Sequence, residues 1–304
     1  MSTPSDTKPL DFDAYWQDTL SQLARLPAAP EVEEIPLRST DFATAYGVQL
    51  TSIGPYRIFG YLSIPTGEGP FPARYFLPRY GSVADLVPQG TSNGQRQRYV
   101  TFAICARGQR RSDRPYSAGF PGQLTDGIDD PSGYIYRGIV ADCCRGLEFL
   151  VSRPEVNPQR VAAIGTDMAL VTAALCPRVT HLVYTPVIFF QALERAAATQ
   201  AYPLEELNDY LRQRPEQRDQ VSQTLAYYDA SHFAPMVGAR TLLMAEAGSS
   251  PLGPAAMEPV TRSIRGSTDV HESENSGYRD GAYSELWLSR ELGVPEASLP
   301  PHWR

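Results

Sequence analysis

The sequence predicts an α/β protein with a mainly parallel central sheet flanked by helices. Three observations support this class. Short apolar runs recur along the 304 residues, helical periodicity lies between them, and two β-like runs precede the first crossover helix. No internal repeat or low-complexity linker interrupts the pattern. We therefore expect a single domain over residues 10–293, with short tails at 1–9 and 294–304.

The N-terminal half is expected to begin with a helix and continue with strands. Apolar residues spaced as on one helical face predict a helix over 11–26. Alternating or short apolar runs predict strands at 47–53, 56–65, 73–77 and 99–106. Gly54 and Pro55 separate the first two runs and are typical of a turn. We expect these first strands to add antiparallel pairs at one edge of the sheet.

The C-terminal half alternates helices with strands. Apolar residues at i, i+3, i+4, i+7 and i+10 predict a helix over 140–150, which Pro154 follows. Strands are predicted at 161–165, 180–188, 240–246 and 268–275, the last alternating like an edge strand. Further helices are expected up to residue 176, in an insertion over about 187–228 that borders a pocket, and over 282–292.

Composition excludes several classes of function. The net charge of −7 argues against a nucleic-acid surface, and no apolar run is long enough for a membrane helix. Lys8 is the single lysine and lies in a polar N-terminal stretch, which excludes a Schiff-base lysine in a core site. The four cysteines lack metal-ligand spacing, so no metal or other cofactor is expected. Without an apolar leader, a cytoplasmic protein with reduced thiols is the simple expectation.

The most informative segment is Gly165-Thr166-Asp167-Met168-Ala169, which follows a buried strand and opens a helix. Small residues on either side of a central residue are typical of a nucleophile elbow, where a strained turn raises one side chain above the sheet. That side chain is Asp167 here. A simpler interpretation is that Gly165 ends the strand and Asp167 caps the helix.

The chain as a whole resembles the acetyl xylan esterase and cephalosporin C deacetylase family of α/β-hydrolases. The resemblance runs from about residue 10 to 292 and is densest over GFPGQLTDGIDDPSGYIYRGIVADCCRGLEFL (119–150). It includes Arg107-Gly108-Gln109, similar to the family's RGQ motif, and TLAYYDASHFAP (224–235). The resemblance implies an α/β-hydrolase fold, action on acetyl esters and assembly into a homo-oligomer.

Enzymes of this family use a Ser–His–Asp triad, and none of its members is matched here. The resemblance places Asp167 at the nucleophile position and Arg279, or Tyr278 with a one-residue slip, at the base position. No carboxylate occupies 247–249, where the acid is expected, and Glu246 is the nearest candidate. Because a lone buried carboxylate is costly, we hypothesise that Asp167 and Arg279 form a charge-assisted pair.

The remaining expected site residues surround the elbow. The backbone N–H of Met168 and a group from Arg79 or Tyr80 are candidates for the oxyanion hole, which Asp167 itself is able to occupy. Tyr80 is equally well interpreted as an ordinary loop tyrosine. The resemblance implies that Arg107 and Gln109 support the loops around the site rather than perform chemistry.

The substituted triad leaves three functional hypotheses. The leading one is a degenerate homologue that keeps a pocket for a small, acetylated sugar-like ligand and has lost normal ester hydrolysis. The second is a hydrolase with Asp167 as nucleophile, which needs His271 as a displaced base because arginine does not deprotonate near neutral pH. The third is the family's ordinary acetyl esterase activity. For His181, His232, His271 and His302, structural roles are expected first.

Overall fold

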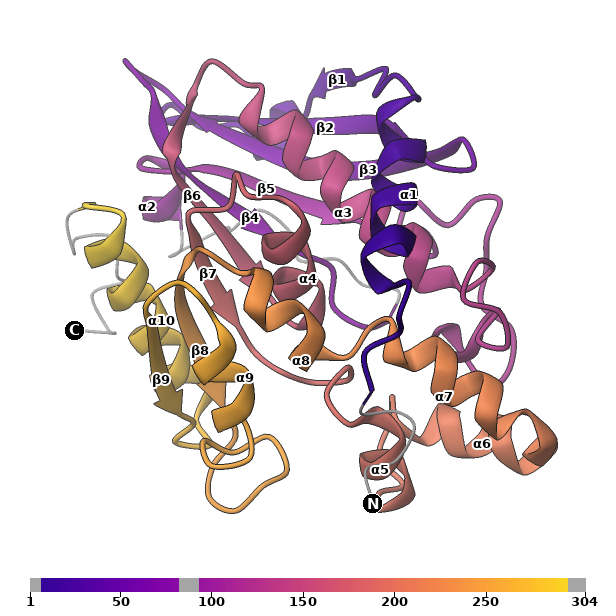
Figure 1. The fold of residues 1–304 in the computed structure, drawn as a ribbon. Coiled ribbons are helices and arrows are strands. Elements are labelled where there is room, and N and C mark those ends of the chain that lie inside the picture. The colour runs from indigo at the N-terminus through magenta and orange to yellow at the C-terminus, as the bar shows by residue number, and fades with distance from the viewer. Residues whose placement is uncertain (1–6, 82–92, 295–304) are drawn as a thin grey trace.

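The computed structural model describes residues 7–81 and 93–294. Within them one nine-stranded sheet has the order β1-β2-β3-β5-β4-β6-β7-β8-β9 (Figure 1). The strands are β1 (Glu31–Glu34), β2 (Ala43–Ser52), β3 (Tyr56–Pro65), β4 (Phe71–Phe76), β5 (Val100–Cys105), β6 (Val156–Gly165), β7 (His181–Tyr184), β8 (Arg240–Ala245) and β9 (Thr268–Glu272). His302, the C-terminal tail from residue 295 and the N-terminal tail up to residue 6 lie outside the described residues.

The predicted fold class is confirmed. The pairs β5–β4, β4–β6, β6–β7, β7–β8 and β8–β9 are parallel, while β1–β2, β2–β3 and β3–β5 are antiparallel. The antiparallel strands therefore extend one edge, as expected. β1 was not predicted, because its four exposed residues carry no apolar pattern.

The helices are α1 (Phe12–Ala24), α2 (Asn93–Arg96), α3 (Ile135–Val151), α4 (Asp167–Leu175), α5 (Ala192–Ala197), α6 (Glu205–Gln213), α7 (Arg218–Ala226), α8 (Ala230–Phe233), α9 (Glu258–Ser263) and α10 (Gly277–Glu291). Helices α5, α6 and α7 lie between β7 and β8 in the chain. Figure 1 shows them beyond one end of the central strands, below the layer that holds α3 and α4.

The two faces of the sheet carry separate apolar cores. On β6, Ala163 contributes to the large core with α1, α3 and α4, whereas its neighbour Ala162 contributes to a smaller core with Trp287 and Leu288 of α10. This alternation follows from the two-residue period of a strand. It places α10 on the opposite face from α3 and α4 (Figure 1). The elbow thus lies at the carboxyl ends of strands that are covered on both sides.

The last helix begins earlier than predicted. α10 starts at Gly277 rather than near residue 282, and the hydroxyl of its N-cap Ser276 accepts the N–H of Arg279 at 3.4 Å. The polar residues before Ala282 concealed this first turn, because they lack the apolar periodicity on which the prediction rested. Arg279 and Asp280 are therefore helical residues and not loop residues. The helix sets the directions in which their side chains point.

Candidate functional site

The turn between β6 and α4 lacks the strain of a working nucleophile elbow. β6 ends at Gly165 and α4 begins at Asp167, with Thr166 between them at φ −91° and ψ −145°. In the described chain the non-glycine residues with positive φ are Ala29, Arg111, Gln191 and Asn275. Asp167 is not among them, so the expected strained conformation at this residue is wrong. The helix starts directly at the position from which a nucleophile would project.

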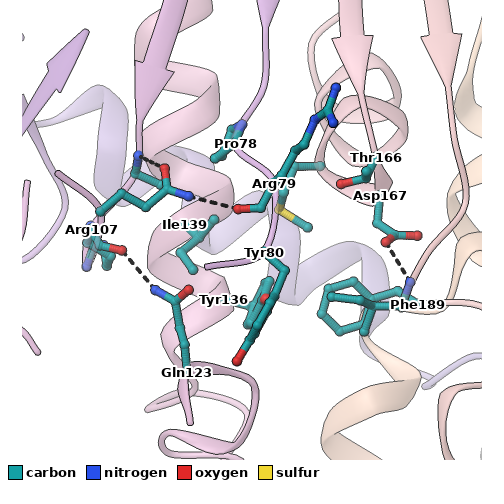
Figure 2. A pocket seen from close by; sticks show the side chains of 14 residues that line it. Pro78, Arg79, Tyr80, Arg107, Gln123, Tyr136, Ile139, Thr166, Asp167 and Phe189 are labelled. Atoms are coloured by element: carbon teal, nitrogen blue, oxygen red, sulfur yellow. Dashed lines mark hydrogen bonds between the residues drawn. The ribbon is translucent and has the colours of Figure 1, made fainter. Parts of the chain in front are cut away.

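The carboxylate of Asp167 is turned into the protein. Its Oδ2 accepts the backbone N–H of Ile188 at 2.8 Å, and its Oδ1 accepts the Tyr184 hydroxyl at 3.3 Å and the Val187 N–H at 3.5 Å. The residue is 3% exposed. Burial raises the pKa of Asp167 above its ordinary value, while the backbone N–H groups oppose that rise. In Figure 2 the carboxylate points away from Tyr80 and toward the segment that carries Phe189.

Arg195 contacts the carbonyl groups of the same segment that donates N–H groups to Asp167. The guanidinium of this α5 residue donates to the carbonyls of Val187, Ile188 and Phe190 at 2.7, 3.3 and 3.1 Å. The peptide groups of residues 187–190 therefore present N–H groups to Asp167 and carbonyl groups to Arg195. The positive charge of Arg195 also favours the ionised form of Asp167. Together they form a closed polar unit, and we call it the Asp167 cradle (Asp167, Tyr184, 187–190 and Arg195).

The predicted ion pair between Asp167 and Arg279 is wrong. Arg279 donates to the carboxylate of Glu274 at 2.6 Å, and its side chain is 68% exposed. Because Arg279 lies in the first turn of α10, its side chain leaves the helix toward Glu274 and solvent. Asp167 meanwhile has its partners in the cradle. Each of the two charged residues of the predicted pair therefore has its own partners, Asp167 in the cradle and Arg279 in Glu274.

Asp280, the next residue, faces the site instead. Its Oδ1 lies 2.9 Å from Nε2 of His271 and accepts the Glu274 N–H at 3.0 Å, and its Oδ2 accepts the Ser273 hydroxyl at 2.7 Å. Burial disfavours the ionised form, but these hydrogen bonds outweigh it and lower the pKa of Asp280 to about 2. The ring of His271 also stacks on Tyr283, with 4.0 Å between centroids. His271 is thus positioned by Asp280.

The elbow, the RGQ segment and the Arg79 segment meet around one small cavity. This elbow cavity is lined by Asp167, Met168, Arg79, Tyr80, Arg107 and Gln109, among others. Its volume of about 20 Å³ holds about one water molecule. Six of the eight predicted site residues are therefore brought together, whereas Arg279 and Glu246 do not line the cavity.

Arg107, labelled in Figure 2, and Gln109 connect the segments that surround the elbow cavity. The guanidinium of Arg107 binds both oxygens of Asp142 on α3 at 2.9 and 2.7 Å. The amide of Gln109 donates to the carbonyls of Arg79 and Gly81 at 2.8 and 2.9 Å. These contacts tie three segments to one another. Met168 lies in the first turn of α4, where helix N–H groups lack partners within the helix.

A larger cavity lies beside the elbow cavity. It has a volume of about 470 Å³ and is lined by Arg79, Tyr80 and Thr166, by the carboxyl ends of β6, β7 and β8, and by Asp280, Gly281 and Ser284 of α10. We call it the strand-end cavity. Ligands of open α/β sheets bind at the carboxyl ends of the strands, so this cavity has the position of a ligand site.

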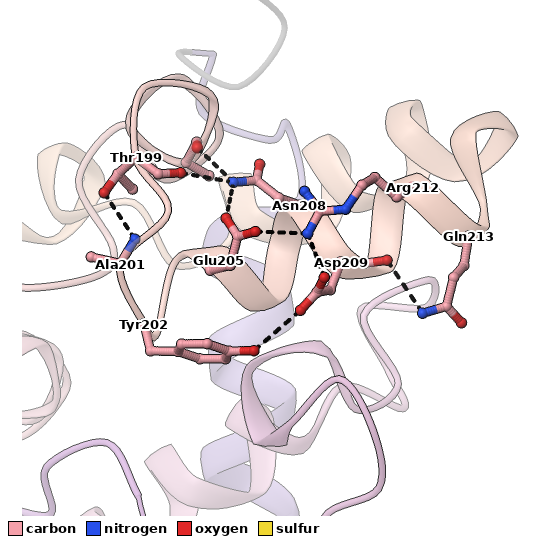
Figure 3. Close-up of polar contacts among 9 residues, drawn as sticks. Thr199, Ala201, Tyr202, Glu205, Asn208, Asp209, Arg212 and Gln213 are labelled. Atoms are coloured by element: carbon pink, nitrogen blue, oxygen red, sulfur yellow. Dashed lines mark hydrogen bonds and ion pairs between the residues drawn. The ribbon is translucent and has the colours of Figure 1, made fainter.

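Glu246 belongs to a third cavity, of about 390 Å³, which it shares with Arg195 and with residues 198, 199 and 201–204. Its carboxylate accepts the Ser250 hydroxyl. Thr199, which also lines this cavity, is held by Asn208, whose amide donates to the carbonyls of Ala196 and Thr199 and to Glu205 (Figure 3). Glu246 therefore lies on the Arg195 side of the Asp167 cradle and does not line the elbow cavity.

Among residues 7–81 and 93–294, no group of three or more His, Cys, Asp or Glu side chains is arranged to hold a metal ion. In the same residues no helix is both long and apolar enough to cross a membrane.

The parallel sheet and a turn that leads from a central strand into a helix beside strand-end cavities define an α/β-hydrolase. A profile described as acetyl xylan esterase (AXE1) matches residues 2–249. The chain therefore belongs to the acetyl xylan esterase family.

Individual relatives agree with this assignment. Acetyl esterase Axe7A from Xylanibacter ruminicola is 25% identical over 244 residues, which cover 76% of this chain. The match spans about half of that relative, 54% of its length. The acetyl xylan esterase from Paenibacillus sp. R4 has a TM-score of 0.79 and 25% identity, covering 95% of this chain and 98% of its own. Acetyl xylan esterase 1 from Thermoanaerobacterium sp. JW/SL YS485 shares the fold, with a TM-score of 0.80, 22% identity and 94% of each chain covered.

Sequence reasoning missed Arg195, Tyr184 and Asp280. Arg195 lies in a polar helix and Tyr184 in a buried strand, so neither residue carries a local signal that points to Asp167. Asp280 was adjacent to the predicted base position, and only the helix start at Gly277 turns it toward the site.

Proposed function

We propose that this chain is a degenerate acetyl ester hydrolase homologue, which binds a small acetylated sugar-like ligand and does not hydrolyse esters by a Ser–His–Asp triad. The observation that carries the proposal is the closed cradle around Asp167. Its carboxylate is buried and bonded to the Ile188 N–H at 2.8 Å, rather than directed at a substrate position. The class of ligand comes from the family and from the names of its relatives.

Acetyl transfer to a serine needs a hydroxyl nucleophile and a nearby base. The nucleophile position holds a carboxylate whose oxygens already accept three hydrogen bonds. The expected base position holds an arginine, which stays protonated at neutral pH and is bound to Glu274. Glu246, the nearest candidate acid, lines another cavity. The residues at the expected nucleophile, base and acid positions are therefore unsuited to those roles in a Ser–His–Asp triad.

The strand-end cavity supports retained binding. Its volume of about 470 Å³ is within the usual range for small-molecule sites. Its walls combine apolar side chains of β6, β7 and β8 with Arg79, Asp280 and Ser284. A sugar presents hydroxyl groups for such polar side chains, and an acetyl group presents a methyl group for the apolar wall.

The experiment is a thermal-shift titration with acetylated xylo-oligosaccharides, combined with an assay for released acetate. We expect Tm to rise with ligand concentration, because binding to the folded state alone stabilises it, and no acetate to appear. Ser284→Phe should fill the cavity and abolish the shift, whereas Ser263→Phe on α9, which does not line it, should keep the shift. Acetate release at a catalytic rate, or no shift with any oligosaccharide, would overturn the proposal.

The second candidate is a hydrolase that uses Asp167 as a nucleophile. It is favoured by one contact, because His271 is paired with Asp280, and Asp280 lines the same cavity as Thr166. In this reaction a carboxylate oxygen attacks an alkyl carbon, the halide or epoxide oxygen leaves, and water then cleaves the ester. An alkyl halide should add mass to Asp167 if this holds, and should leave Asp167→Asn unmodified at that position. We expect no adduct on Asp167 if the chain is a degenerate homologue.

We further propose a homo-oligomer in the cytoplasm, without nucleic-acid or membrane partners. The family's habit of assembly supports the first part, and the net charge of −7 supports the absence of nucleic acid. Sedimentation of the purified chain measures its oligomeric state, and a monomer at all concentrations would contradict assembly.

A further inference from the structure

Three of the four cysteines gather where α3 and α4 meet. Cys143 and Cys144 lie in the middle of α3, and Cys176 is the residue that ends α4. The sulfurs of Cys144 and Cys176 are 3.2 Å apart, although 32 positions separate the residues in sequence. All four cysteines are thiols, and Cys105 lies in another core, with Phe59 and Tyr61.

We propose that Cys144 and Cys176 form a reversible intramolecular disulfide when the protein meets a hydroperoxide. The bond length of a disulfide is about 2.05 Å, so the two sulfurs need to approach by only about 1 Å. Cys176 follows the last turn of α4, with φ −125° and ψ 95° at the boundary of the helix. A residue at a helix end adjusts more readily than one within a helix, so Cys176 supplies this movement.

The two sulfurs have different surroundings, which assigns their roles. Cys176 is partly exposed, whereas Cys144 is 1% exposed. The hydrogen bond between the Cys144 thiol and Cys176, together with burial, holds the pKa of Cys144 well above its ordinary value. Cys176 is therefore the sulfur that reacts with the oxidant, and Cys144 is the sulfur that resolves the product.

The chemistry is balanced with a hydroperoxide as the oxidant. The thiolate of Cys176 attacks one peroxide oxygen, so that an S–O bond forms, the O–O bond breaks and the first water leaves after proton transfer. The sulfur of Cys144 then attacks the Cys176 sulfenic acid, so that the S–S bond forms, the thiol proton is released and the second water leaves. Two thiols are oxidised and one hydrogen peroxide is reduced to two waters. A dithiol reductant reverses the change.

The bond would connect α3 to the end of the helix that begins at Asp167. It would close a loop that contains β6, the elbow and the whole of α4. Such a cross-link restricts the unfolded chain, and for a loop of this length we expect Tm to rise by on the order of 5 °C. The oxidised form would hold the elbow and the cysteine pair in one covalent ring.

The test is oxidation of the full chain with hydrogen peroxide, alkylation of the remaining thiols, and peptide mapping without reduction. We expect alkylatable thiols to fall from four to two, one cross-linked peptide pair joining Cys144 to Cys176, and recovery of all thiols with dithiothreitol. The peptide map of the wild type tests for the Cys144–Cys176 disulfide even if a variant does not fold. Cross-linking to Cys143, a disulfide between chains, or sulfinic acid at Cys176 without a cross-link would overturn the proposal.

Matched variants separate this bond from general oxidation. Cys176→Ser and Cys144→Ser should each abolish the cross-link and the rise in Tm on oxidation. Cys105→Ser, in the other core, should retain both, and Cys143→Ser should also retain both, because its neighbour forms the bond. A peroxide-induced rise in Tm that persists in Cys176→Ser would contradict the assignment.

Discussion

The side chain of Asp167 and the backbone amide of Ile188 are joined by a 2.8 Å hydrogen bond, at the place where a hydrolase of this fold presents its nucleophile. The bond directs the carboxylate into residues 187–190 and leaves the elbow cavity with room for about one water molecule. The carboxylate that stands at this position, in place of the family's serine, is thus bound by the loop that contains Ile188. The loop is in turn held by Arg195.

Asp167 and Arg195 are predicted to be energetically coupled. Asp167→Ala leaves the buried Ile188 N–H without its acceptor, and Arg195→Ala leaves three carbonyls without their donor, so each should lower the free energy of unfolding by about 1–3 kcal/mol. The double variant should lose less than the sum, by about 1 kcal/mol, because both residues act on the same turn.

Urea unfolding of the wild type and the three variants measures this coupling. Arg212→Ala on α6, whose side chain is 59% exposed, is the matched control and should change stability by less than about 1 kcal/mol. Effects of Asp167→Ala and Arg195→Ala that simply add would show that the cradle is not a unit.

Glu206 is predicted to make stability depend on pH. It is buried on α6, and its carboxylate accepts the N–H of Leu124 at 2.9 Å. Burial raises the pKa of Glu206 to about 7, the charge of Asp209 adds to this, and the Leu124 N–H opposes it. The folded-state pKa exceeds the ordinary value of 4.5. The stabilisation of the folded state by Glu206 is therefore fully present below pH ~4.5 and is lost as the pH rises through about 7.

Glu206→Gln keeps an acceptor oxygen and removes the titration. Relative to the variant, the wild type should lose about 1–3 kcal/mol of unfolding free energy between pH 4.5 and 8, as measured by urea denaturation at each pH. Glu216→Gln, at an exposed position, provides the control and should follow the wild-type profile. Parallel profiles for the wild type and Glu206→Gln would disprove a raised pKa.

Gly138 is predicted to be essential for the position of Arg107. A Cβ atom at Gly138 would lie 2.3 Å from a guanidinium nitrogen of Arg107, which is too close. Gly138→Ala should displace that guanidinium from Asp142 and lower the unfolding free energy by about 2–4 kcal/mol, since the Asp142 carboxylate is buried. Gly277→Ala, where a Cβ meets nothing within 4 Å, should be close to neutral. A wild-type Tm for Gly138→Ala would contradict the role of this contact.

The fold was predictable because its signals are local and repeated. Buried strands such as 240–246 are recognisable from short apolar runs, and the helix over 140–150 from its apolar face. β1 carries no such pattern, since its residues are exposed on both faces. The early start of α10 also escaped prediction, because its first turn is held by a Ser276 cap and polar contacts.

The site was predictable in position and not in detail. The small residues around Asp167 identify the turn, and the RGQ segment identifies its neighbour, because both patterns lie within a few residues. The partner of Asp167 depends on residues 187–195, which only the folded chain brings near. The pairing with Arg279 assumed a loop where the chain forms a helix. The predicted pair failed because the first turn of α10 begins at Gly277 and directs Arg279 toward Glu274.

The most direct measurement of the central claim is p-nitrophenol release from p-nitrophenyl acetate, with purified wild type compared with Asp167→Ala. If the proposed loss of hydrolysis holds, we expect no release above the buffer rate from either protein, because the Asp167 carboxylate is bonded within residues 184–188 and the expected base position holds Arg279. Turnover by the wild type that Asp167→Ala abolishes would contradict it and show that Asp167 performs chemistry. Equal turnover by both would place an esterase site elsewhere and contradict the interpretation of the elbow.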